Sequence, residues 1–335
     1  MRAMVMAAGL GKRLRPLTYE IPKPLVPVGN RPIMEHILMR LADDGFSEVT
    51  ANLHWFPETI RDRFGNGAGL GIDLTYSYEE RLLGTAGGVR NVREYFGSEP
   101  FVVMAADALT DIDLAALARA HAEHDWIATL AVKPVKDTSE YGVIVTSDDG
   151  RVVGFQEKPD PAEARSDLAN CMIYVLEPEI FEHFPPAEEV DFALDVFPAL
   201  LEREVPFGVH VTDAYWNDVG SLPEYLQGNF DVLGGAVAVD PAGEIVDSGA
   251  AAGLGDDVEL SGPVLFGDGV RIGEGVRLDG PVVIGPGAQI GAGARVRESV
   301  LLPGAEVPAD GLLAGAIAGS ARALAGIAAG AQPRP

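Results

Sequence analysis

An apolar residue recurs at every sixth position near the carboxyl end of the chain, and this repeat constrains the fold more than any other feature. The first residue of each unit is apolar and small or branched: Val258, Val264, Val270, Val276, Val282, Ala288, Ala294 and Val300. A second apolar residue follows two positions later: Leu260, Phe266, Ile272, Leu278, Ile284, Ile290, Val296 and Leu302. In four units glycine comes next, at Gly267, Gly273, Gly285 and Gly291. This period predicts short strands joined at sharp corners that glycine allows.

The eight units resemble the left-handed β-helix family, in which three hexads make one coil. The resemblance implies a short prism of slightly under three coils over residues 256–307, followed by an Ala/Gly-rich tail at 308–335. Its handedness would break the usual right-handed crossover rule. Since the open ends and flat faces of such a β-helix need covering, we expect a homo-oligomer.

Strand and helix patterns alternate over residues 1–232. The β-rich runs lie at 3–8, 49–53, 72–78, 101–105 and 127–132. Helical patterns lie at 32–44, 57–64 and 86–96, and a fourth starts with a capping box at Thr110, where Asp111 and Asp113 are best explained as capping residues. The alternation predicts an α/β domain with a Rossmann-like, mostly parallel sheet that binds ligands at the carboxyl ends of its strands. Residues 233–255 are predicted to form a linker.

The charge of the chain limits the classes of partner. A net charge of −25 disfavours nucleic acids and anionic membranes. Residues 1–31 nevertheless contain six basic residues and one acidic residue, which is typical of an anion site or of an ordinary solvated face. The single cysteine, Cys171, excludes an internal disulfide framework, and no run of about 20 apolar residues predicts a membrane span. We therefore expect a cytoplasmic protein.

The loop after the first predicted strand is the main candidate for phosphate binding. Gly9 and Gly11 let backbone N–H groups approach a ligand. Arg13 offers a planar fork for phosphate oxygens, and Lys23 adds a compact charge between two prolines that fix the backbone. The glycine spacing differs from that of a P-loop, and Leu14 stands where the dinucleotide-binding fingerprint needs a small residue.

The run GLGKRLRPLTYEIPKPLVPVGNRP, which starts at Gly9, resembles the signature of the sugar nucleotidyltransferase family, G-x-G-x-R-L-x-P-L-T followed by P-K-P. The resemblance implies an enzyme that joins an NTP to a sugar 1-phosphate and releases pyrophosphate. It also implies that Arg13 and Lys23 bind the NTP phosphates and support catalysis, and that Ala8, Gly9 and Gly11 lie against the nucleotide.

Two aspartates are candidate ligands of Mg²⁺, since this ion usually takes one or two carboxylates together with phosphates and water. Asp107 follows the apolar run 101–105, and Asp218 lies in the segment WNDVG. They resemble the aspartates of the family's G-D and W-x-D-x-G motifs, although Ala106 replaces the usual glycine. The resemblance therefore implies that both hold Mg²⁺.

A further segment resembles the family's nucleobase motif, and another resembles its sugar motif. In LGTAG, Gly84 and Thr85 are the expected base contacts. In EKP, Glu157 is expected to bind sugar hydroxyls, and Lys158 is expected to reach the sugar phosphate and take part in catalysis.

Asn170 fits the family's N-A-G segment, which lines the sugar pocket. Cys171 and Met172 replace the Ala-Gly that usually follows the asparagine. Met172 adds bulk where a close backbone approach to the sugar is expected.

The preferred reading is a mannose-1-phosphate guanylyltransferase, and a glucose-1-phosphate thymidylyl- or uridylyltransferase is the alternative. A non-catalytic, nucleotide-sugar-binding regulatory protein is an alternative of another class, because the guanine-exchange subunits of a eukaryotic translation initiation factor share this two-part architecture. The presence of the arginine, both lysines and both aspartates favours an enzyme. Hexapeptide acyltransferases usually employ a histidine base beside the β-helix, whereas no histidine follows His210.

Overall fold

The computed structural model describes residues 1–247 and 257–319, and the chain folds into two compact units. The first, the sheet unit, contains Met1–Leu10 and Ile37–Trp216. The second, the β-helix unit, contains Gly11–His36 and the described chain from Asn217 onward. The chain from Gly11 to His36 and the last helix (Leu222–Leu233) thus belong to the same unit as the β-helix. None of the described helices has both the length and the apolar character needed to cross a lipid bilayer.

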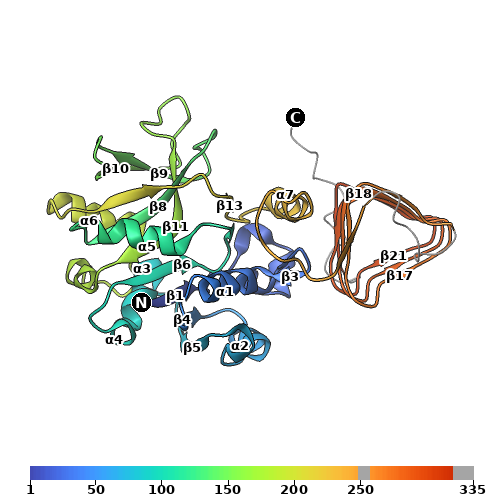
Figure 1. The fold of residues 1–335 in the computed structure, drawn as a ribbon, viewed down its shortest axis with the longest axis horizontal. Helices are drawn as coiled ribbons and strands as arrows, with labels where there is room; N and C mark the ends of the chain where they lie inside the picture. Colours follow the sequence, from blue (N-terminus) through green and yellow to red (C-terminus); the bar gives the residue numbers. More distant parts are fainter. Residues whose placement is uncertain (248–256, 320–335) are drawn as a thin grey trace. The chain divides into compact units, whose positions relative to one another are not determined.

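A nine-stranded mixed sheet forms the centre of the sheet unit (Figure 1). Four parallel neighbours make one part of it: β6 (Phe101–Ala105), β1 (Arg2–Met6), β4 (Glu48–Leu53) and β5 (Asp73–Tyr78). The other strands are β8 (Ala128–Pro134), β9 (Gly142–Thr146), β10 (Val152–Glu157), β11 (Leu168–Leu176) and β12 (Gly208–Val211). There β11 runs antiparallel to β6, β8 and β9, whereas β12 is parallel to β8. The predicted α/β fold class is confirmed.

Helices and short segments connect these strands. The α-helices are α1 (Ile33–Asp43), α2 (Pro57–Phe64), α3 (Gly84–Asn91), α4 (Arg93–Phe96), α5 (Leu114–Ala122), α6 (Phe197–Glu202) and α7 (Leu222–Leu233). The 3₁₀ and π turns are η1 (Lys12–Leu14), η2 (Leu17–Tyr19), η3 (Lys23–Leu25), η4 (Ala68–Leu70), η5 (Pro178–His183) and η6 (Phe192–Val196). The two-residue strands before the β-helix are β2 (Pro27–Val28), β3 (Arg31–Pro32), β7 (Leu109–Thr110) and β13 (Trp216–Asn217). In the sheet unit, α3 contacts β1, and α5 contacts β8, β11 and β12.

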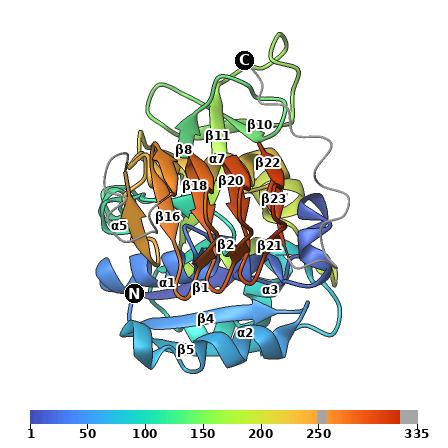
Figure 2. The ribbon, with the colours of Figure 1, turned by 90° about the vertical axis from the view of Figure 1, so that its right-hand side faces the viewer.

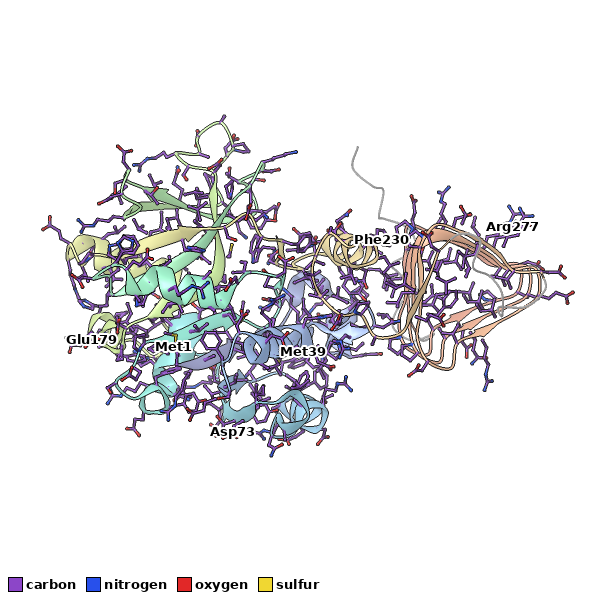
Figure 3. All side chains as sticks on the ribbon, viewed as in Figure 1. Met1, Met39, Asp73, Glu179, Phe230 and Arg277 are labelled. Carbon is purple, nitrogen blue, oxygen red and sulfur yellow. The ribbon has the colours of Figure 1, made fainter. Side chains whose placement is uncertain are left out.

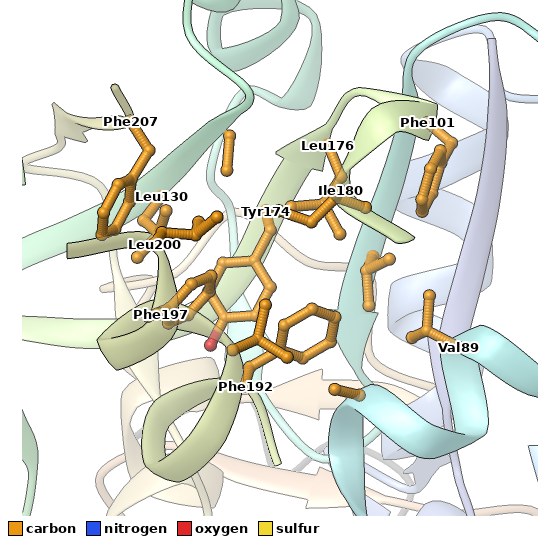
Figure 4. Close-up of a cluster of buried hydrophobic side chains, with 14 of the residues drawn as sticks. Val89, Phe101, Leu130, Tyr174, Leu176, Ile180, Phe192, Phe197, Leu200 and Phe207 are labelled. Atoms are coloured by element: carbon orange, nitrogen blue, oxygen red, sulfur yellow. The ribbon is translucent and has the colours of Figure 1, made fainter. Parts of the chain in front are cut away.

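Aromatic side chains fill the core of the sheet unit around Tyr174. This residue of β11 is fully buried, and its ring meets those of Phe192 and Phe197 edge to face, with centroids 5.3 Å apart in both pairs (Figure 4). Such pairs add about 0.5–1.5 kcal/mol each beyond the burial of their area. Asn170 Nδ2 donates a hydrogen bond to the Tyr174 hydroxyl at 2.9 Å. The core therefore fixes a residue that the sequence places in the sugar pocket.

The helix expected after Thr110 begins later, at Leu114. Its N-cap is Asp113, whose Oδ1 accepts a hydrogen bond from Ala116 N at 2.6 Å. Thr110 lies in β7 instead, and its hydroxyl donates to Tyr215 O at 2.7 Å. The prediction of a capping box at Thr110 is therefore wrong, because the bond to the Tyr215 segment keeps the backbone extended at that point.

The hexapeptide region forms a β-helix whose strands stack in parallel (Figure 2). Its strands are β15 (Glu259–Ser261), β16 (Val264–Phe266), β17 (Arg271–Ile272), β18 (Arg277–Ile284), β19 (Gln289–Ile290), β20 (Arg295–Leu301), β21 (Glu306–Val307), β22 (Leu312–Ala314) and β23 (Ile317–Ala318). Arg277 pairs with Arg295, three hexads later, and Val264 pairs with Val282 at the same interval. Both valines are fully buried in the interior. The six-residue period thus produces one coil for every three units.

The coil that contains Glu298 is one residue shorter than a strict six-residue repeat would give. Val282 pairs with Ser299, although the repeat would place Val300 opposite it. A single residue, Glu298, turns this corner with a φ of 45°. Ser299 is fully buried, and its hydroxyl donates to Arg297 O at 2.6 Å. Val300 therefore pairs with Val283, because the shorter corner moves the following residues by one position.

The parallel strands continue beyond residue 307, where the β-helix was expected to end. Both β22 and β23 pair with β20. Before the β-helix, β14 (Glu244–Val246) pairs antiparallel with β16, within the segment 233–255 expected to form a linker. The other parts of the expected linker and tail, at 248–256 and 320–335, lie outside the described residues.

The repeated glycines are needed for space and not for a positive φ. An added Cβ would lie 2.4 Å from Ala309 N at Gly291, and 2.4 Å from Ala292 N at Gly273. Neither glycine has a positive φ. The glycines that do have a positive φ stand two residues later in the corner, as Gly293 does with a φ of 70°. The close approach of the next coil therefore explains why these corner positions need glycine.

We expect Gly291→Ala to lower the melting temperature of the protein more than Gly269→Ala does. The first change places Cβ against backbone of the next coil, and overpacking of this kind costs about 3 kcal/mol. The second has open space around the new Cβ but a φ of 68°, a conformation that costs alanine about 1 kcal/mol. Calorimetry measures both variants. Equal melting temperatures would contradict the steric explanation of the repeat.

His36 joins α1 to the hairpin formed by β2 and β3. Its Nε2 lies 2.9 Å from Val28 O, and because a carbonyl only accepts, this nitrogen carries the proton. The side chain is buried within the β-helix unit. Burial lowers the pKa of His36 below its usual value, and the charge of Arg31 acts in the same direction. The neutral ring is therefore the form that the fold favours.

Because the folded state lowers the pKa of His36, the unfolded chain binds a proton more readily. The stability that this residue contributes is complete above the unfolded-state pKa of about 6.5, and it is lost as the pH falls toward the folded-state value. We expect the melting temperature to decrease between about pH 7.5 and about pH 5.5, and to decrease less in His36→Gln. The same decrease in both proteins would contradict this role.

Candidate active site

The glycine loop folds into a tight turn that needs glycine at one position. Gly11 has a φ of 59°, and an added Cβ would lie 2.9 Å from Thr18 Cγ2 and 3.0 Å from Lys23 Cβ. The Thr18 hydroxyl donates to Gly11 O at 2.8 Å and closes the turn. At Gly9 an added Cβ would have no neighbour within 4 Å. Gly11 thus shapes the loop, while Gly9 leaves open space beside the end of β1.

Two cations of this loop converge on Asp218 within the β-helix unit. Arg13 Nη2 lies 3.3 Å from Asp218 Oδ2, and Lys23 Nζ donates to Asp218 O at 3.1 Å. Lys23 is 8% exposed, whereas the Arg13 side chain is 55% exposed. An added Cβ at Gly220 would lie 2.7 Å from both Arg13 Nη1 and Asp218 Oδ2. The structure therefore brings together three predicted site residues in a space that glycine keeps open, and we call them the Arg13–Lys23–Asp218 cluster.

A strained turn holds Asp218 before the start of α7. Val219 has a φ of 41°, and such a conformation of a residue other than glycine costs about 1–3 kcal/mol. Val219 N donates to Asn217 Oδ1 at 2.8 Å, and Asn217 Nδ2 donates to Glu224 O at 3.2 Å. Ser221 is the N-cap of α7 and accepts from Glu224 N. These bonds hold the backbone of the turn that carries Asp218.

Asp107 lies in the sheet unit, in the turn after β6. Ala106 N donates to Met6 O at 3.0 Å, so the pairing of β6 with β1 continues up to this turn, and the alanine that replaces the family's glycine is buried there. Beyond the turn, Tyr215 N donates to Asp111 Oδ1 at 2.7 Å. Asp111 therefore binds a neighbouring segment, and its expected capping role is wrong. Tyr215 stands three residues before Asp218 in the sequence.

The donor set of the Arg13–Lys23–Asp218 cluster fits the predicted Mg²⁺. It offers carboxylate oxygens, which this ion prefers, beside cations that would offset the charge of phosphates. Within residues 1–247 and 257–319, no group of three or more His, Cys, Asp or Glu side chains is arranged to hold a metal ion. Phosphate oxygens and water would have to supply the remaining ligands, as is usual for Mg²⁺.

In the sheet unit, residues 190–192 pack against the predicted base-binding segment and bond to it. Gly84 has a φ of 78°, and an added Cβ would lie 2.4 Å from Val190 O. The Thr85 hydroxyl donates to Asp191 Oδ2 at 2.8 Å and accepts from Phe192 N at 3.0 Å. The Thr85 hydroxyl therefore holds the segment in place. The backbone of the segment is the part that could bind a ligand.

Asn52 and Glu79 connect this segment to the end of β1, and sequence reasoning missed both. Ala7 N donates to Asn52 Oδ1 at 2.8 Å, Asn52 Nδ2 donates to Glu79 Oε1 at 2.7 Å, and Leu83 N donates to Glu79 Oε2 at 3.1 Å. Both side chains are 3% exposed, and Gly88 leaves the room they need. The available signal was a polar residue at the carboxyl end of each of two parallel strands, where ligands of such sheets bind.

The predicted sugar-binding residues lie at the same end of neighbouring strands. Glu157 at the end of β10 pairs with Gly142 on β9, and Ala169 of β11 pairs with Val143, the next residue of β9. Asn170 follows Ala169 and is thus close to Glu157 in register. Lys158 has a φ of 45°, its N–H donates to Tyr141 O at 3.0 Å, and its side chain is exposed.

Met172 has a backbone conformation that explains why the family prefers glycine at this position. Its φ is 58°, at an irregularity of β11 between Asn170 and Tyr174. Met172 N donates to Asn170 Oδ1 at 3.0 Å, so the irregularity also orients the asparagine. Cys171 is buried, which raises the pKa of its thiol to about 12 and keeps it protonated.

Comparisons with known proteins agree with this architecture. The sequence matches the nucleotidyl transferase family over residues 2–234 and the bacterial transferase hexapeptide (six repeats) over residues 263–298. UTP–glucose-1-phosphate uridylyltransferase from Synechocystis sp. is 37% identical over 291 residues, which cover 81% of this chain and 75% of the relative. Mannose-1-phosphate guanylyltransferase from Mycobacterium tuberculosis is 35% identical over 293 residues, which cover 81% of this chain and 80% of the relative.

A solved structure shares the fold of a large part of the chain. HddC from Yersinia pseudotuberculosis, crystallised with GMP-PN, aligns with a TM-score of 0.59 at 25% identity, covering 68% of this chain and 97% of its own. The family match extends over more than half of the chain, and the two curated relatives are more than 30% identical to it. The chain therefore belongs to the nucleotidyl transferase family.

Proposed function

We propose that the protein transfers a nucleotidyl group from an NTP to a sugar 1-phosphate and releases pyrophosphate, with GTP and mannose 1-phosphate as its substrates. The Arg13–Lys23–Asp218 cluster carries this proposal, because it offers two cations and a carboxylate to a metal-bound triphosphate. Both curated relatives have names that give an NTP-dependent transfer to a sugar 1-phosphate. The guanylyltransferase from M. tuberculosis and the GMP-PN bound by HddC support guanine as the base.

Glucose 1-phosphate with UTP is the second candidate pair. It is favoured by the Synechocystis relative, which is a uridylyltransferase and is slightly more similar in sequence than the guanylyltransferase. The two candidates share the same phosphate chemistry and differ in the base and the sugar. A substrate survey therefore separates them.

The proposed reaction is an in-line displacement at the α-phosphorus. An oxygen of the sugar phosphate forms the new bond to this atom, while the bond to the bridging oxygen of the leaving pyrophosphate breaks, and no covalent enzyme intermediate is needed. Catalysis is then mainly positioning and charge stabilisation. We assign Arg13 and Lys23 to the triphosphate, and Lys158 to the orientation of the attacking phosphate.

We propose Asp107 and Asp218 as ligands of the metal ion and Mg²⁺ as that ion. Nucleotidyltransferases of this family generally use a divalent metal ion, which neutralises phosphate oxygens when it is bound. The hydrogen bonds that join Tyr215 to Thr110 and Asp111 support the assignment. They connect a segment three residues before Asp218 to one that begins three residues after Asp107.

The remaining assignments follow the same division between nucleotide and sugar. The proposed nucleotide contacts are the backbone of Ala8, Gly9, Gly11, Gly84 and Thr85. The proposed sugar contacts are Glu157 and Asn170. We further propose that the catalytic part spans residues 1–232, and a homo-oligomer and a cytoplasmic location stay predictions.

A matrix of GTP, UTP, dTTP and ATP against mannose 1-phosphate and glucose 1-phosphate tests the proposal. Pyrophosphate release is measured with Mg²⁺, with EDTA, and after Mg²⁺ is restored. We expect GTP with mannose 1-phosphate to give the highest kcat/KM, and EDTA to stop the reaction reversibly. A higher kcat/KM for UTP with glucose 1-phosphate would favour the second candidate. No release with any pair, while an NTP still binds, would favour a non-catalytic protein.

We expect Lys23→Ala and Asp218→Ala each to lower kcat/KM by at least about 100-fold, since removing one preorganised charge from the transition state typically costs about 10²–10³ in rate. Arg119→Ala and Asp62→Ala are charge-matched controls, because both side chains are exposed on helices of the sheet unit. They should retain the rate of the unmodified protein. Near-normal turnover in a folded Lys23→Ala or Asp218→Ala protein would refute the assignment.

A further inference from the structure

The β-helix is bonded directly to the chain segment that carries the phosphate-binding cations. Asn30, in the turn between β2 and β3, donates from Nδ2 to Ile284 O at 2.9 Å. Ile284 belongs to β18 and is fully buried in the β-helix core. Asn30 has a φ of 61°, a conformation that asparagine tolerates better than most residues. The hairpin turn is thus anchored on a fully buried residue of the β-helix core.

Helix α7 provides a second connection between the same parts. Gly29 N donates to Asn229 Oδ1 at 2.9 Å, and the hydroxyl of Tyr225 donates to Pro27 O at 2.7 Å. Asn229 is fully buried, and α7 also contacts β18 and β20. Because α7 begins four residues after Asp218, one helix joins the β-helix, the hairpin and the proposed metal ligand.

The chain that follows α7 forms a third connection. Ala242 N donates to Gly29 O at 2.8 Å, and Arg31 Nε donates to Asp240 O at 2.9 Å. This segment then enters β14, which pairs with β16 of the β-helix. The hairpin is therefore bonded to the β-helix, to α7 and to the segment after α7 that leads into β14.

Motion of the hairpin would be transmitted to Lys23 over a very short distance along the chain. Lys23 begins η3, in which Leu25 N donates to Pro22 O at 2.8 Å and Val26 N donates to Lys23 O at 3.1 Å. The next residue, Pro27, already belongs to β2 of the hairpin. A rigid 3₁₀ turn thus joins the cation to the anchored hairpin.

We infer that the β-helix is a positioning element for nucleotide binding, and that Asn30 is the positioning residue through which it holds the Lys23 turn. The inference rests on the proposed function for the role of Lys23 toward the triphosphate. It gives the β-helix a part in catalysis within a single chain, in addition to any part in assembly. The parameters that depend on the NTP should therefore respond to a change at the hairpin, whereas the KM for the sugar phosphate should not.

Two variants of the full chain remove the anchor in different ways. Asn30→Gly deletes the side chain but keeps the positive φ accessible. Asn30→Asp keeps the size but replaces the donor with an oxygen that faces the Ile284 carbonyl. Arg277→Ala is the control on the β-helix, because its side chain points away from the β-helix core toward solvent and forms an exposed ion pair with Glu259 (Figure 3). Such pairs contribute little to stability.

Hydrogen exchange followed by mass spectrometry reports on the Lys23 turn without any need for activity. We expect the amides of residues 22–28 to exchange at least about threefold faster in both Asn30 variants and at the normal rate in Arg277→Ala. In steady-state kinetics, kcat/KM for the NTP should fall about fivefold, the loss of one ordinary hydrogen bond, with an unchanged KM for the sugar 1-phosphate.

Three results would overturn the inference. They are unchanged exchange at residues 22–28, faster exchange that extends equally through β1 and β6 and so reports general destabilisation, and normal NTP kinetics despite faster local exchange. A failure of the proposed function is distinct, since it would show as no pyrophosphate release by the unmodified protein. The exchange experiment would then still decide whether the β-helix holds the loop.

Discussion

The attraction of Arg13 and Lys23 to Asp218 is the interaction on which the candidate site depends. The chain carries a net charge of −25, so an anionic substrate needs a local group of cations to bind at all. Arg13 is more than half exposed, and solvent screening makes its ion pair with Asp218 weak. Exchange of this carboxylate for the phosphate oxygens of the proposed substrate would therefore be easy. Lys23 is buried and donates to a main-chain carbonyl, which keeps its charge in place.

Strained backbone marks several segments of the candidate site. Val219, Lys158 and Met172 all have positive φ values, beside the proposed metal ligand, in the proposed phosphate contact and next to the sugar-pocket asparagine. Each conformation persists because hydrogen bonds of neighbouring groups hold it, as Asn217 does for Val219. Strain of this kind concentrates at functional positions, where it directs a side chain that a relaxed backbone would point elsewhere.

The sequence predicted the elements whose signals are local. The run before Gly9 reads as a strand because it is apolar and bounded by glycine, and the hexad period follows from the geometry of a single coil. Long-range features were beyond reach. The Asn52–Glu79 bond joins residues 27 positions apart and depends on how β4 and β5 pair. The corner at Glu298 shortens a coil by one residue while leaving the apolar residues around it nearly in period. The hydrogen bond from Asn30 to Ile284 joins residues 254 positions apart and leaves no trace in either segment alone.

A crystal structure of the protein with Mn²⁺ and a non-hydrolysable NTP analogue would show whether the Arg13–Lys23–Asp218 cluster binds a metal-bound triphosphate. We expect an anomalous peak about 2.1 Å from a carboxylate oxygen of Asp218, with Lys23 and Arg13 in hydrogen-bond contact with the triphosphate. Arg13 should then have exchanged Asp218 for phosphate oxygens. A triphosphate bound away from Lys23, with Arg13 still paired to Asp218 and no metal ion beside that carboxylate, would contradict the account.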